Sequence, residues 1–384
     1  VVEVQNSNPR PLAPKAGWIS YLILIYYIVK LNHNMDDRIN IIKNNTPLID
    51  LRAPIEFNKG AFPSSINIPI LNDIQRAKVG TKYKKQGTNS AEKLGFDLVK
   101  NQQNEKVYLW KKFIEKNPST YIYCMRGGRR SQIAKSWLHY EGINVSVVNG
   151  GYKALRNTAI EILNSVNNDQ KSWIILAGRT GTGKTAILEN LDSSIDLEKH
   201  AVHRGSAFGG LAKQQPTVIN FENNLASEYI KHNNNILFLE DESRRIGKLN
   251  IPNAWYKKMK ESKIIIIELA LEERIINIAK EYVYNPLKDG IPKEKLNKLL
   301  QSSLFKIHKR LGLKLYNEIS IKIQNILINL YKIPHEEWIK ELLVNYYDPM
   351  YDYQLESKKD RCLLKSNKSE VIKFLSQIEA NQSL

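Results

Sequence analysis

The stretch WIILAGRTGTGKT, residues 173–185, decides how the second half of this chain folds. Its apolar first part predicts a buried strand, and GRTGTGKT fits the phosphate-binding pattern G-x4-G-K-[ST] between a strand and a helix. The glycines permit a tight turn in which backbone N–H groups bind two linked phosphates, while the lysine adds a positive charge and the threonine hydroxyl can bind Mg²⁺. A chance glycine-rich turn explains the pattern much less well. The residues expected to bind the phosphates are Gly178, Gly181, Gly183, Lys184 and Thr185.

Strands and helices are predicted to alternate on both sides of this loop. The expected strands are residues 48–52, 120–124, 145–152, 172–178, 235–241 and 263–270, and the clearest expected helices are 107–116, 131–142, 271–282 and 318–331. Ser131 is expected to be an N-cap residue. Such alternation is typical of α/β folds with parallel sheets. The chain is therefore expected to contain two α/β domains followed by a helical C-terminal region.

Acidic and basic residues follow the apolar run ILFL of the strand expected at 235–241. Glu240, Asp241 and Glu242 stand where a carboxylate that binds a phosphate-bound cation is found, although a solvated, acidic strand end explains them about as well. Because acidic residues are scarce in this chain, we favour a functional role. Arg244 and Arg245, in ESRRIG, are candidate phosphate or RNA contacts.

A second short loop, HRGSAFGG at residues 203–210, is rich in glycine, serine and arginine. His203 and Arg204 are candidate phosphate contacts there. A lone histidine is more often structural than functional, so on chemistry alone His203 is the weaker candidate of this group.

The stretch YIYCMRGGRRS, residues 121–131, places one of only two cysteines between an expected strand and an expected helix. Loop N–H groups and the helix N-terminus favour an anion there, and Arg126, Arg129 and Arg130 add positive charge, so Cys124 is expected to form a thiolate. The spacing C-x5-R also occurs in phosphatases, so spacing alone does not separate sulfur transfer from phosphate hydrolysis. A buried, inert cysteine is the less favoured alternative.

Composition indicates a polyanionic partner. The formal net charge is +18, which favours nucleic acid, although a chain rich in lysine, asparagine and isoleucine is in part simply basic by composition. Two cysteines cannot form a disulfide framework, so a cytoplasmic protein is expected. The apolar run at 18–29 is shorter than the roughly 20 residues of a membrane span, and no membrane association is expected. Residues 1–34 are interpreted as an over-extended gene start before Met35.

The first half of the chain resembles a rhodanese domain. LIDLRAPIEFNKGAFPSSINIPI (48–70) has that domain's D-x-R, E-F and G-A-F-P…N-I-P elements in order, CMRGGRRS has its active-site loop, and NGGYKAL (149–155) has its closing segment. The resemblance implies that Cys124 carries a persulfide or an equivalent chalcogen adduct.

The whole motif set resembles the tRNA 2-selenouridine synthase family. The matching segments are LIDLRAPIEF, RAKVGTKYKKQG (76–87), YCMRGGRRS, NGGYKALR, GRTGTGKT, HRGSAFGG, QPT…FEN, EDESRRIG and YYDPMYDYQ (346–354). They span residues 48–354, while residues 1–34 match nothing in the family. A Walker-type loop alone is unspecific, but C-x-RGG-x-RS followed by HRGSAFG and EDESRRIG is highly specific to this family.

That resemblance implies a tRNA-modifying transferase. Wobble 2-thiouridine would first be alkylated on sulfur by geranyl diphosphate, and selenium from selenophosphate would then replace the S-geranyl group. The phosphate-binding loop would hold the diphosphate, with Mg²⁺ as a possible cofactor and no resident protein metal. Cys124, Arg126 and Arg130 would serve the selenium step, the basic surface would bind tRNA, and a selenophosphate synthetase would supply selenium.

The expected domains are an unassigned extension (1–34), a rhodanese-like parallel-sheet domain (35–160), a linker (161–170), a P-loop NTPase-like α/β domain (171–290) and a mostly helical region (291–384). Cys362 is interpreted as structural or incidental. Two alternatives are a rhodanese-type sulfurtransferase with a regulatory P-loop domain and a P-loop kinase or NTPase with a rhodanese-like binding module. Neither explains why HRGSAFGG and EDESRRIG occur together.

Overall fold

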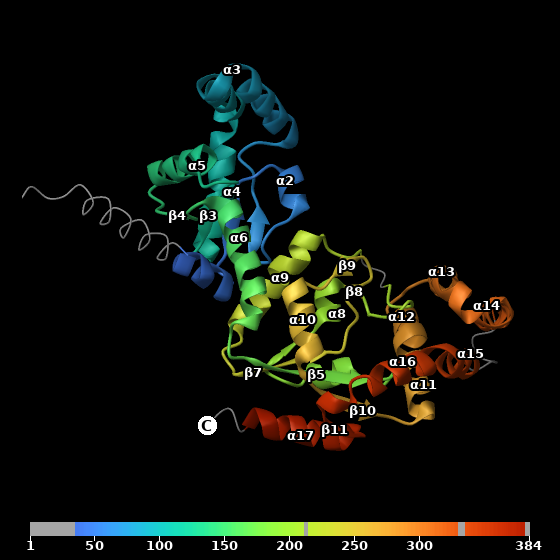
Figure 1. Ribbon diagram of the computed structural model, residues 1–384. Coiled ribbons are helices and arrows are strands. Elements are labelled where there is room, and N and C mark those ends of the chain that lie inside the picture. The colour runs from blue at the N-terminus through green and yellow to red at the C-terminus, as the bar shows by residue number, and fades with distance from the viewer. Residues whose placement is uncertain (1–34, 211–213, 329–334, 381–384) are drawn as a thin grey trace, which may run out of the picture. The chain divides into compact units, whose positions relative to one another are not determined.

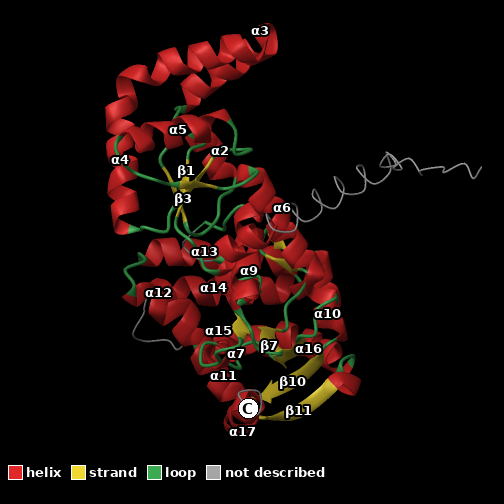
Figure 2. Cartoon of the chain, turned by 90° about the vertical axis from the view of Figure 1, so that its left-hand side faces the viewer, coloured by secondary structure: helices red, strands yellow, loops and turns green. Residues whose placement is uncertain are grey.

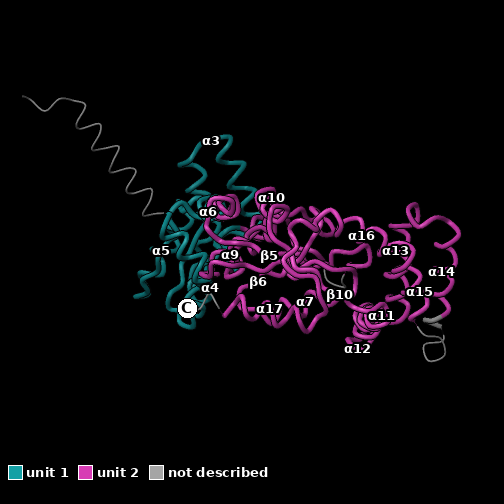
Figure 3. The backbone as a smooth tube through the Cα atoms, turned by 60° about the horizontal axis from the view of Figure 1, so that its bottom comes forward, with its two compact units in different colours: residues 1–52, 66–158 teal, residues 53–65, 159–384 magenta. Residues whose placement is uncertain are grey.

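The computed structural model describes residues 35–210, 214–328 and 335–380. It divides the chain into two compact units (Figures 1 and 3): unit 1 comprises residues 1–52 and 66–158, and unit 2 comprises residues 53–65 and 159–384. The apolar run at 18–29 lies outside the described residues. Across the described ranges, no helix combines the length and apolar character needed to cross a membrane.

Unit 1 is built on a four-stranded sheet with the strand order β2-β1-β3-β4. Its strands are β1 (Leu48–Asp50), β2 (Ser65–Asn67), β3 (Tyr121–Tyr123) and β4 (Ser146–Val147). The pairs β1–β3 and β3–β4 are parallel, as the alternating pattern predicts. At the end of β1, Arg52 and Asp50 form a fully buried ion pair of 2.6 Å, so the D-x-R element holds a structural pair.

The helices of unit 1 include helical residues 35–43, α3 (Asp73–Val99), α4 (Gln103–Lys116), α5 (Arg129–Tyr140) and the start of α6 (Gly151–Asn164). Trp110 of α4 and Trp137 of α5 stack at 6.1 Å within the core. Figure 2 shows α3 turning back on itself, because Gly87 adopts a left-handed conformation (φ 76°) that divides the helix in two. The motif at 76–87 therefore forms the first arm and ends at the turn.

Unit 2 contains a five-stranded sheet with the order β11-β10-β5-β7-β6, and all its strands are parallel. The strands are β5 (Ser172–Gly178), β6 (Ser194–Ile195), β7 (Ile236–Glu240), β10 (Lys263–Glu268) and β11 (Cys362–Asn367). The order of the strands along the sheet reverses at β5, the strand that precedes the phosphate-binding loop. Ligands of parallel α/β sheets bind at the carboxyl ends of strands at such a switch point.

Helices cover both faces of this sheet. One face packs against α7 (Lys184–Leu188) and α17 (Lys368–Ala380). On the other, Trp173 of β5 meets Trp255 of α10 (Asn253–Glu261) at 5.1 Å and Tyr229 of α9 (Val218–Lys231) at 6.1 Å. Other short elements of unit 2 are α2 (Pro54–Lys59), α8 (Leu197–Ala201) and the hairpin of β8 (Arg245–Ile246) and β9 (Leu249–Asn250).

The region after β10 is mostly helical and forms its own apolar core. Its helices are α11 (Leu271–Ala279), α12 (Asn285–Lys288), α13 (Lys293–Leu311), α14 (Leu313–Ile328), α15 (Glu336–Leu342) and α16 (Asp348–Glu356), with π-helical turns η3 (Lys280–Tyr284) and η4 (Leu343–Tyr347). Strand β11 was not foreseen: it returns to the sheet beside β10, so Cys362 begins a sheet strand.

Two local predictions were wrong. Ser131 is not an N-cap residue, because α5 begins at Arg129 with Gly128 in the cap position and the N–H of Ser131 already bonds to Gly128 O at 3.0 Å. The linker predicted at 161–170 begins too early, because α6 continues to Asn164 and is followed by a 3-10 turn at Ser165–Asn167. The boundary between the two units falls inside α6.

Helix α16 is attached to the rest of unit 2 by two ion pairs. Arg274 of α11, itself 1% exposed, binds Asp348 at 2.8 Å. Arg179, in the phosphate-binding loop, binds Asp352 at 2.6 Å, and both of these side chains are about half exposed. The motif YYDPMYDYQ thus supplies the two carboxylates that fix α16 beside the loop.

Asp348→Asn is expected to destabilise unit 2 by about 3 kcal/mol, because it leaves the buried Arg274 charge without its partner. Asp352→Asn breaks an exposed pair and should cost less than about 1 kcal/mol. Thermal unfolding of the full chain tests the contrast, with a fall in melting temperature of several degrees for the first variant only. Equal melting temperatures for both variants would contradict the assignment of Arg274–Asp348 as the stronger anchor.

Candidate functional site

The phosphate-binding loop joins β5 to α7 at the carboxyl edge of the unit 2 sheet. Gly181 (φ 86°) and Gly183 (φ 77°) are in the left-handed region, and a Cβ on Gly181 would lie 2.8 Å from Arg274 O, so a side chain is excluded at that point. Lys184 Nζ donates to Gly178 O at 3.2 Å and so folds back over the loop. The predicted phosphate-binding residues therefore lie in one loop.

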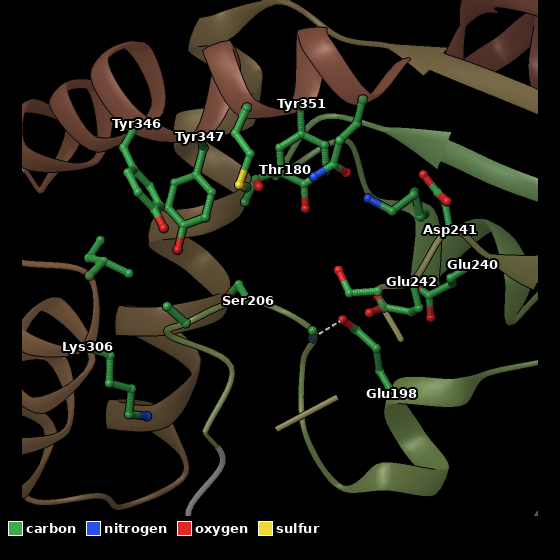
Figure 4. Close-up of a pocket in the computed structure, with 18 of the residues that line it drawn as sticks. Thr180, Glu198, Ser206, Glu240, Asp241, Glu242, Lys306, Tyr346, Tyr347 and Tyr351 are labelled. Carbon is green, nitrogen blue, oxygen red and sulfur yellow. Dashed lines mark hydrogen bonds between the residues drawn. The ribbon is translucent and has the colours of Figure 1, made fainter. Parts of the chain in front are cut away.

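Three carboxylates gather beside this loop, from Glu198 of α8, Glu240 at the end of β7 and Glu242 just after it (Figure 4). One oxygen from each lies within 4.8 Å of the others. Thr185 Oγ1 donates to Glu240 Oε2 at 3.3 Å. Glu240 is 1% exposed, which rules out a solvated strand end for this residue. Its Oε1 has no hydrogen-bond partner among the residues that the structure describes.

Burial and crowding control the charges of these groups. Burial first, and then the neighbouring Glu198, raise the pKa values of Glu240 and Glu242 well above the ordinary range. Burial alone would lower the pKa of Lys184, but Tyr351 and the three carboxylates outweigh it, and the net pKa of Lys184 is raised. The lysine therefore stays charged, while the carboxylates repel one another and would gain from a bound cation.

The loop and the carboxylates line one large cavity of about 990 Å³. Asp241 lines it too, but its carboxylate forms a close ion pair with Lys358. Helix α16 and the turn η4 form the wall opposite the acidic residues, as Figure 4 shows. The cavity therefore has a phosphate-binding end, an acidic side and a largely aromatic wall. The residues of that wall are Tyr282, Tyr346, Tyr347, Met350 and Tyr351.

The aromatic wall continues into a small apolar recess. This recess, of about 30 Å³, shares Tyr282 and Tyr347 with the main cavity and is closed by Phe208, Ile278 and Trp338. Burial raises the pKa values of Tyr282, Tyr347 and Tyr351, so these phenols remain neutral. This side of the cavity therefore suits an uncharged, apolar ligand part.

The loop HRGSAFGG contributes its backbone and small residues to the cavity. Gly205 N–H donates to Glu198 in a close hydrogen bond, and Gly205, Ser206 and Ala207 line the cavity. His203 and Arg204 do not line it. Arg204 forms an ion pair with Glu281 at 2.7 Å, and its guanidinium lies 5.0 Å from the Tyr282 ring centroid. His203 is buried, and its backbone forms an isolated β-bridge with Gly210. Burial lowers the pKa of His203.

Arg244 and Arg245 also lie outside the cavity lining. Both are exposed, Arg244 donating to Asn253 at 2.8 Å and Arg245 to Gly247 O at 2.8 Å, so they hold the surface turn around β8 and β9. From this turn, Ser243 alone reaches the cavity.

The cysteine loop belongs to unit 1. Cys124, at the end of β3, is 4% exposed, and its thiol points to Gly128 O at 3.9 Å. The segment after β4 closes the loop: Tyr152 N–H donates to Cys124 O at 2.9 Å and Lys153 N–H to Met125 O at 3.0 Å. Gly151 is in tight contact with the loop, since a Cβ there would lie 2.3 Å from Cys124 O.

The three arginines of this loop differ in environment. Arg129 binds Glu92 of α3 at 2.8 Å and is 75% exposed, so part of its charge is already compensated. Arg126 is exposed and Arg130 is half-buried. Helix α5 starts at Arg129, five residues after Cys124, so its N-terminus follows the loop as predicted.

Together these features define a two-unit protein: a P-loop unit with a phosphate-binding cavity and a unit with a rhodanese-type cysteine loop. The family model for the rhodanese-like domain matches residues 33–158, and the model for the tRNA 2-selenouridine synthase AAA domain matches residues 171–382. The chain belongs to the tRNA 2-selenouridine synthase family.

Relatives named tRNA 2-selenouridine synthase align over nearly their full length. One from Shewanella denitrificans is 43% identical over 347 residues, covering 86% of this chain and 94% of the relative. Another from Pseudomonas paraeruginosa is 41% identical over 352 residues, covering 88% and 95%.

Sequence reasoning missed several residues of the cavity. Glu198 and Glu281 carry no motif signal beyond their acidity, and the YYDPMYDYQ segment was noted only as a family match. Glu240 was considered with its neighbours, but the structure places Glu240 next to Thr185, while Asp241 pairs with Lys358. Both side chains line the same cavity, so the sequence pattern offers no signal that Lys358, far along the chain, would occupy the Asp241 carboxylate.

Gly151→Ala is expected to destabilise unit 1 by about 2 kcal/mol or more, because a methyl group at φ 60° would collide with the backbone of the cysteine loop. Gly128→Ala is the matched control: it has a negative φ and open space at the Cβ position. Circular dichroism melts and the rate of Cys124 alkylation would be measured. Equal loop reactivity in both variants would contradict the closing role of Gly151.

Proposed function

We propose that this chain is a tRNA-modifying transferase that converts 2-thiouridine at the wobble position to 2-selenouridine through an S-geranylated intermediate. One observation carries the proposal most directly: the cavity joins the loop of the G-x4-G-K-[ST] motif to an aromatic, largely uncharged wall. A prenyl diphosphate has those two parts, an anionic head and an apolar chain.

The phosphate end would act on the leaving group. In the first step the C–O bond of geranyl diphosphate breaks, a bond forms from its carbon to the sulfur of 2-thiouridine, and diphosphate departs. The N3–H proton of 2-thiouridine is released to solvent. Lys184 and the loop N–H groups would bind the negative charge that grows on the diphosphate, so they stabilise the transition state more than the substrate. The residues Gly178, Gly181, Gly183 and Thr185 would form the rest of this cradle.

The carboxylates fit a divalent cation. The Thr185 hydroxyl with Glu198, Glu240 and Glu242 forms a set of hard oxygen ligands of the kind that Mg²⁺ prefers, and Glu240 Oε1 has no other partner among the described residues. Mg²⁺ would neutralise charge on the diphosphate. Without a cation, the three carboxylates stay crowded beside Lys184.

The aromatic wall of the cavity suits the isoprenoid chain of a prenyl diphosphate. The side of the cavity formed by Tyr346, Tyr347 and Met350 offers surface for isoprenoid methyl groups, and the recess behind Tyr282 and Tyr347 extends it. Burying one such side-chain contact contributes about 1–2 kcal/mol.

Cys124, Arg126 and Arg130 would serve the second step, in which the selenium of selenophosphate forms a bond to C2 and the C2–S bond breaks to release geranyl thiol. Water then hydrolyses the Se–P bond, which releases phosphate and leaves 2-selenouridine. Alkylation makes that departure feasible, because a thiocarbonyl sulfur leaves poorly. The basic chain would bind tRNA in the cytoplasm, and a selenophosphate synthetase would supply the selenium donor. A plain sulfurtransferase would leave the acidic and aromatic parts of the cavity without a role.

Cys124→Ala is expected to block selenation and spare geranylation, whereas Lys184→Ala should lower the geranylation rate by about 100-fold. Mass spectrometry of nucleosides from 2-thiouridine tRNA, incubated with geranyl diphosphate with and without selenophosphate, measures both steps. Loss of both activities in a folded Cys124→Ala protein would contradict the assignment of the two steps to separate sites. Unchanged 2-thiouridine after incubation with the native chain would favour the sulfurtransferase alternative.

Met350→Gln is expected to raise KM for geranyl diphosphate about fivefold or more, because a polar amide replaces an apolar contact of similar volume. Inhibition by inorganic diphosphate should not change, since the loop is intact. Tyr353→Gln is the control on the same helix, where the side chain is 81% exposed and outside the cavity lining. If Met350→Gln also weakened inhibition by inorganic diphosphate, a separate binding site for the isoprenoid chain would be contradicted.

A further inference from the structure

The last turns of α13 carry a stacked pair of aromatic rings, of which Phe305 is exposed and His308 is half-buried. The rings of Phe305 and His308 lie 4.5 Å apart with an interplanar angle of 9°, and Tyr316 of α14 meets the Phe305 ring edge-on at 6.4 Å. Phe305 is 58% exposed. His308 Nδ1 lies 2.6 Å from Phe305 O, which can only accept, so this nitrogen donates and fixes the plane of the imidazole.

The exposed ring of Phe305 lies outside the apolar core. The opposite face of α13 already buries Leu296, Leu300, Leu304 and Ile307, which follow one another at helical spacing. Phe305 lies off that stripe and leaves more than half of its surface in water. A single exposed phenylalanine is common, but a flat, stacked pair with a fixed ring plane forms a surface on which another ring can stack.

Three positive charges surround the pair. Lys306, Lys309 and Arg310 are exposed, and none of them forms an ion pair with the residues that the structure describes. Cations at the end of a helix are favoured by its dipole, which accounts for some of this charge. The dipole does not account for exposed rings among the cations, a combination typical of surfaces that bind single-stranded nucleic acid.

This surface is at the rim of the phosphate-binding cavity. Phe305, Lys306, His308, Lys309 and Arg310 all line the same cavity as Lys184, and Figure 4 shows Lys306 across the cavity from Glu198. A nucleoside that enters the cavity would therefore have its flanking nucleotides at the end of α13.

We propose that Phe305 and His308 form a stacking platform for an unpaired base next to the nucleotide that reacts in the cavity, and that Lys306, Lys309 and Arg310 bind the adjoining phosphates. The proposal rests on the function proposed above and adds to it the surface that selects RNA. Stacking requires an unstacked base, so this surface selects a single-stranded loop over a helix. An acidic protein would use the cations but would not need the rings.

Fluorescence anisotropy with the full chain tests this in the absence of geranyl diphosphate and selenophosphate. The probes are a short RNA hairpin with 2-thiouridine in its unpaired loop and a fully paired RNA duplex of equal length. The variants are Phe305→Ala, Phe305→Trp and Leu313→Ala. Leu313 is the matched control, because it is an apolar side chain that is 71% exposed and does not line the cavity.

Phe305→Ala should weaken hairpin binding about tenfold and duplex binding much less, Phe305→Trp should retain affinity, and Leu313→Ala should behave like the native chain. Lys309→Ala with Arg310→Ala should lower the salt dependence of hairpin binding by about 0.7 in the log–log slope per lost phosphate contact. Native affinity in Phe305→Ala, or equal losses on hairpin and duplex, would overturn the proposal.

The two proposals fail in different ways. If the native chain geranylates 2-thiouridine RNA while Phe305→Ala binds and reacts normally, the platform is wrong and the proposed function stands. If the native chain binds the hairpin with dependence on Phe305 but gives no modified nucleoside, the platform stands as an RNA-binding surface and the proposed chemistry fails.

Discussion

The buried ion pair between Arg274 and Asp348 is the interaction on which the cavity depends. It fixes α16 against α11, and α16 in turn carries Met350 and Tyr351 into the cavity wall. The backbone of Arg274 also packs against Gly181 of the phosphate-binding loop, so one residue positions both the wall and the loop. Since Arg274 is 1% exposed, losing Asp348 would leave a buried charge unpaired, and the wall would lose its anchor.

Within the cavity, the positive charge of Lys184 lies beside the three carboxylates of Glu198, Glu240 and Glu242. Lys184 keeps its proton because Tyr351 and three carboxylates outweigh the effect of burial on its pKa. Those carboxylates are crowded to within 4.8 Å and have raised pKa values, so they gain from a cation and from the lysine alike. An anionic head group between Lys184 and a bound cation would be held from both sides, which is the requirement for a good diphosphate leaving group.

The two loops that carry the chemistry are built by the same means in different units. In each, a strand of a parallel sheet ends in a turn whose glycines lie close to other backbone, and a helix follows. In unit 2 a Cβ on Gly181 would lie 2.8 Å from Arg274 O, and in unit 1 a Cβ on Gly127 of the cysteine loop would lie 2.9 Å from Val148 O. Tight backbone contacts leave little freedom in either loop, so each site is held in its shape before any ligand binds.

The sequence alone determined the strand–loop–helix pattern around Lys184 and Cys124, the parallel sheets and the order of the two units, because these depend on short-range periodicity and glycine placement. Only the tertiary structure decided which charges meet. Glu198, Glu240 and Glu242 lie close to one another, and Glu240 also accepts from Thr185. Asp241 pairs with Lys358, and Arg204 pairs with Glu281. Strand β11 and the aromatic wall likewise depend on contacts between residues far apart in the chain, and local pattern carries no information about such contacts.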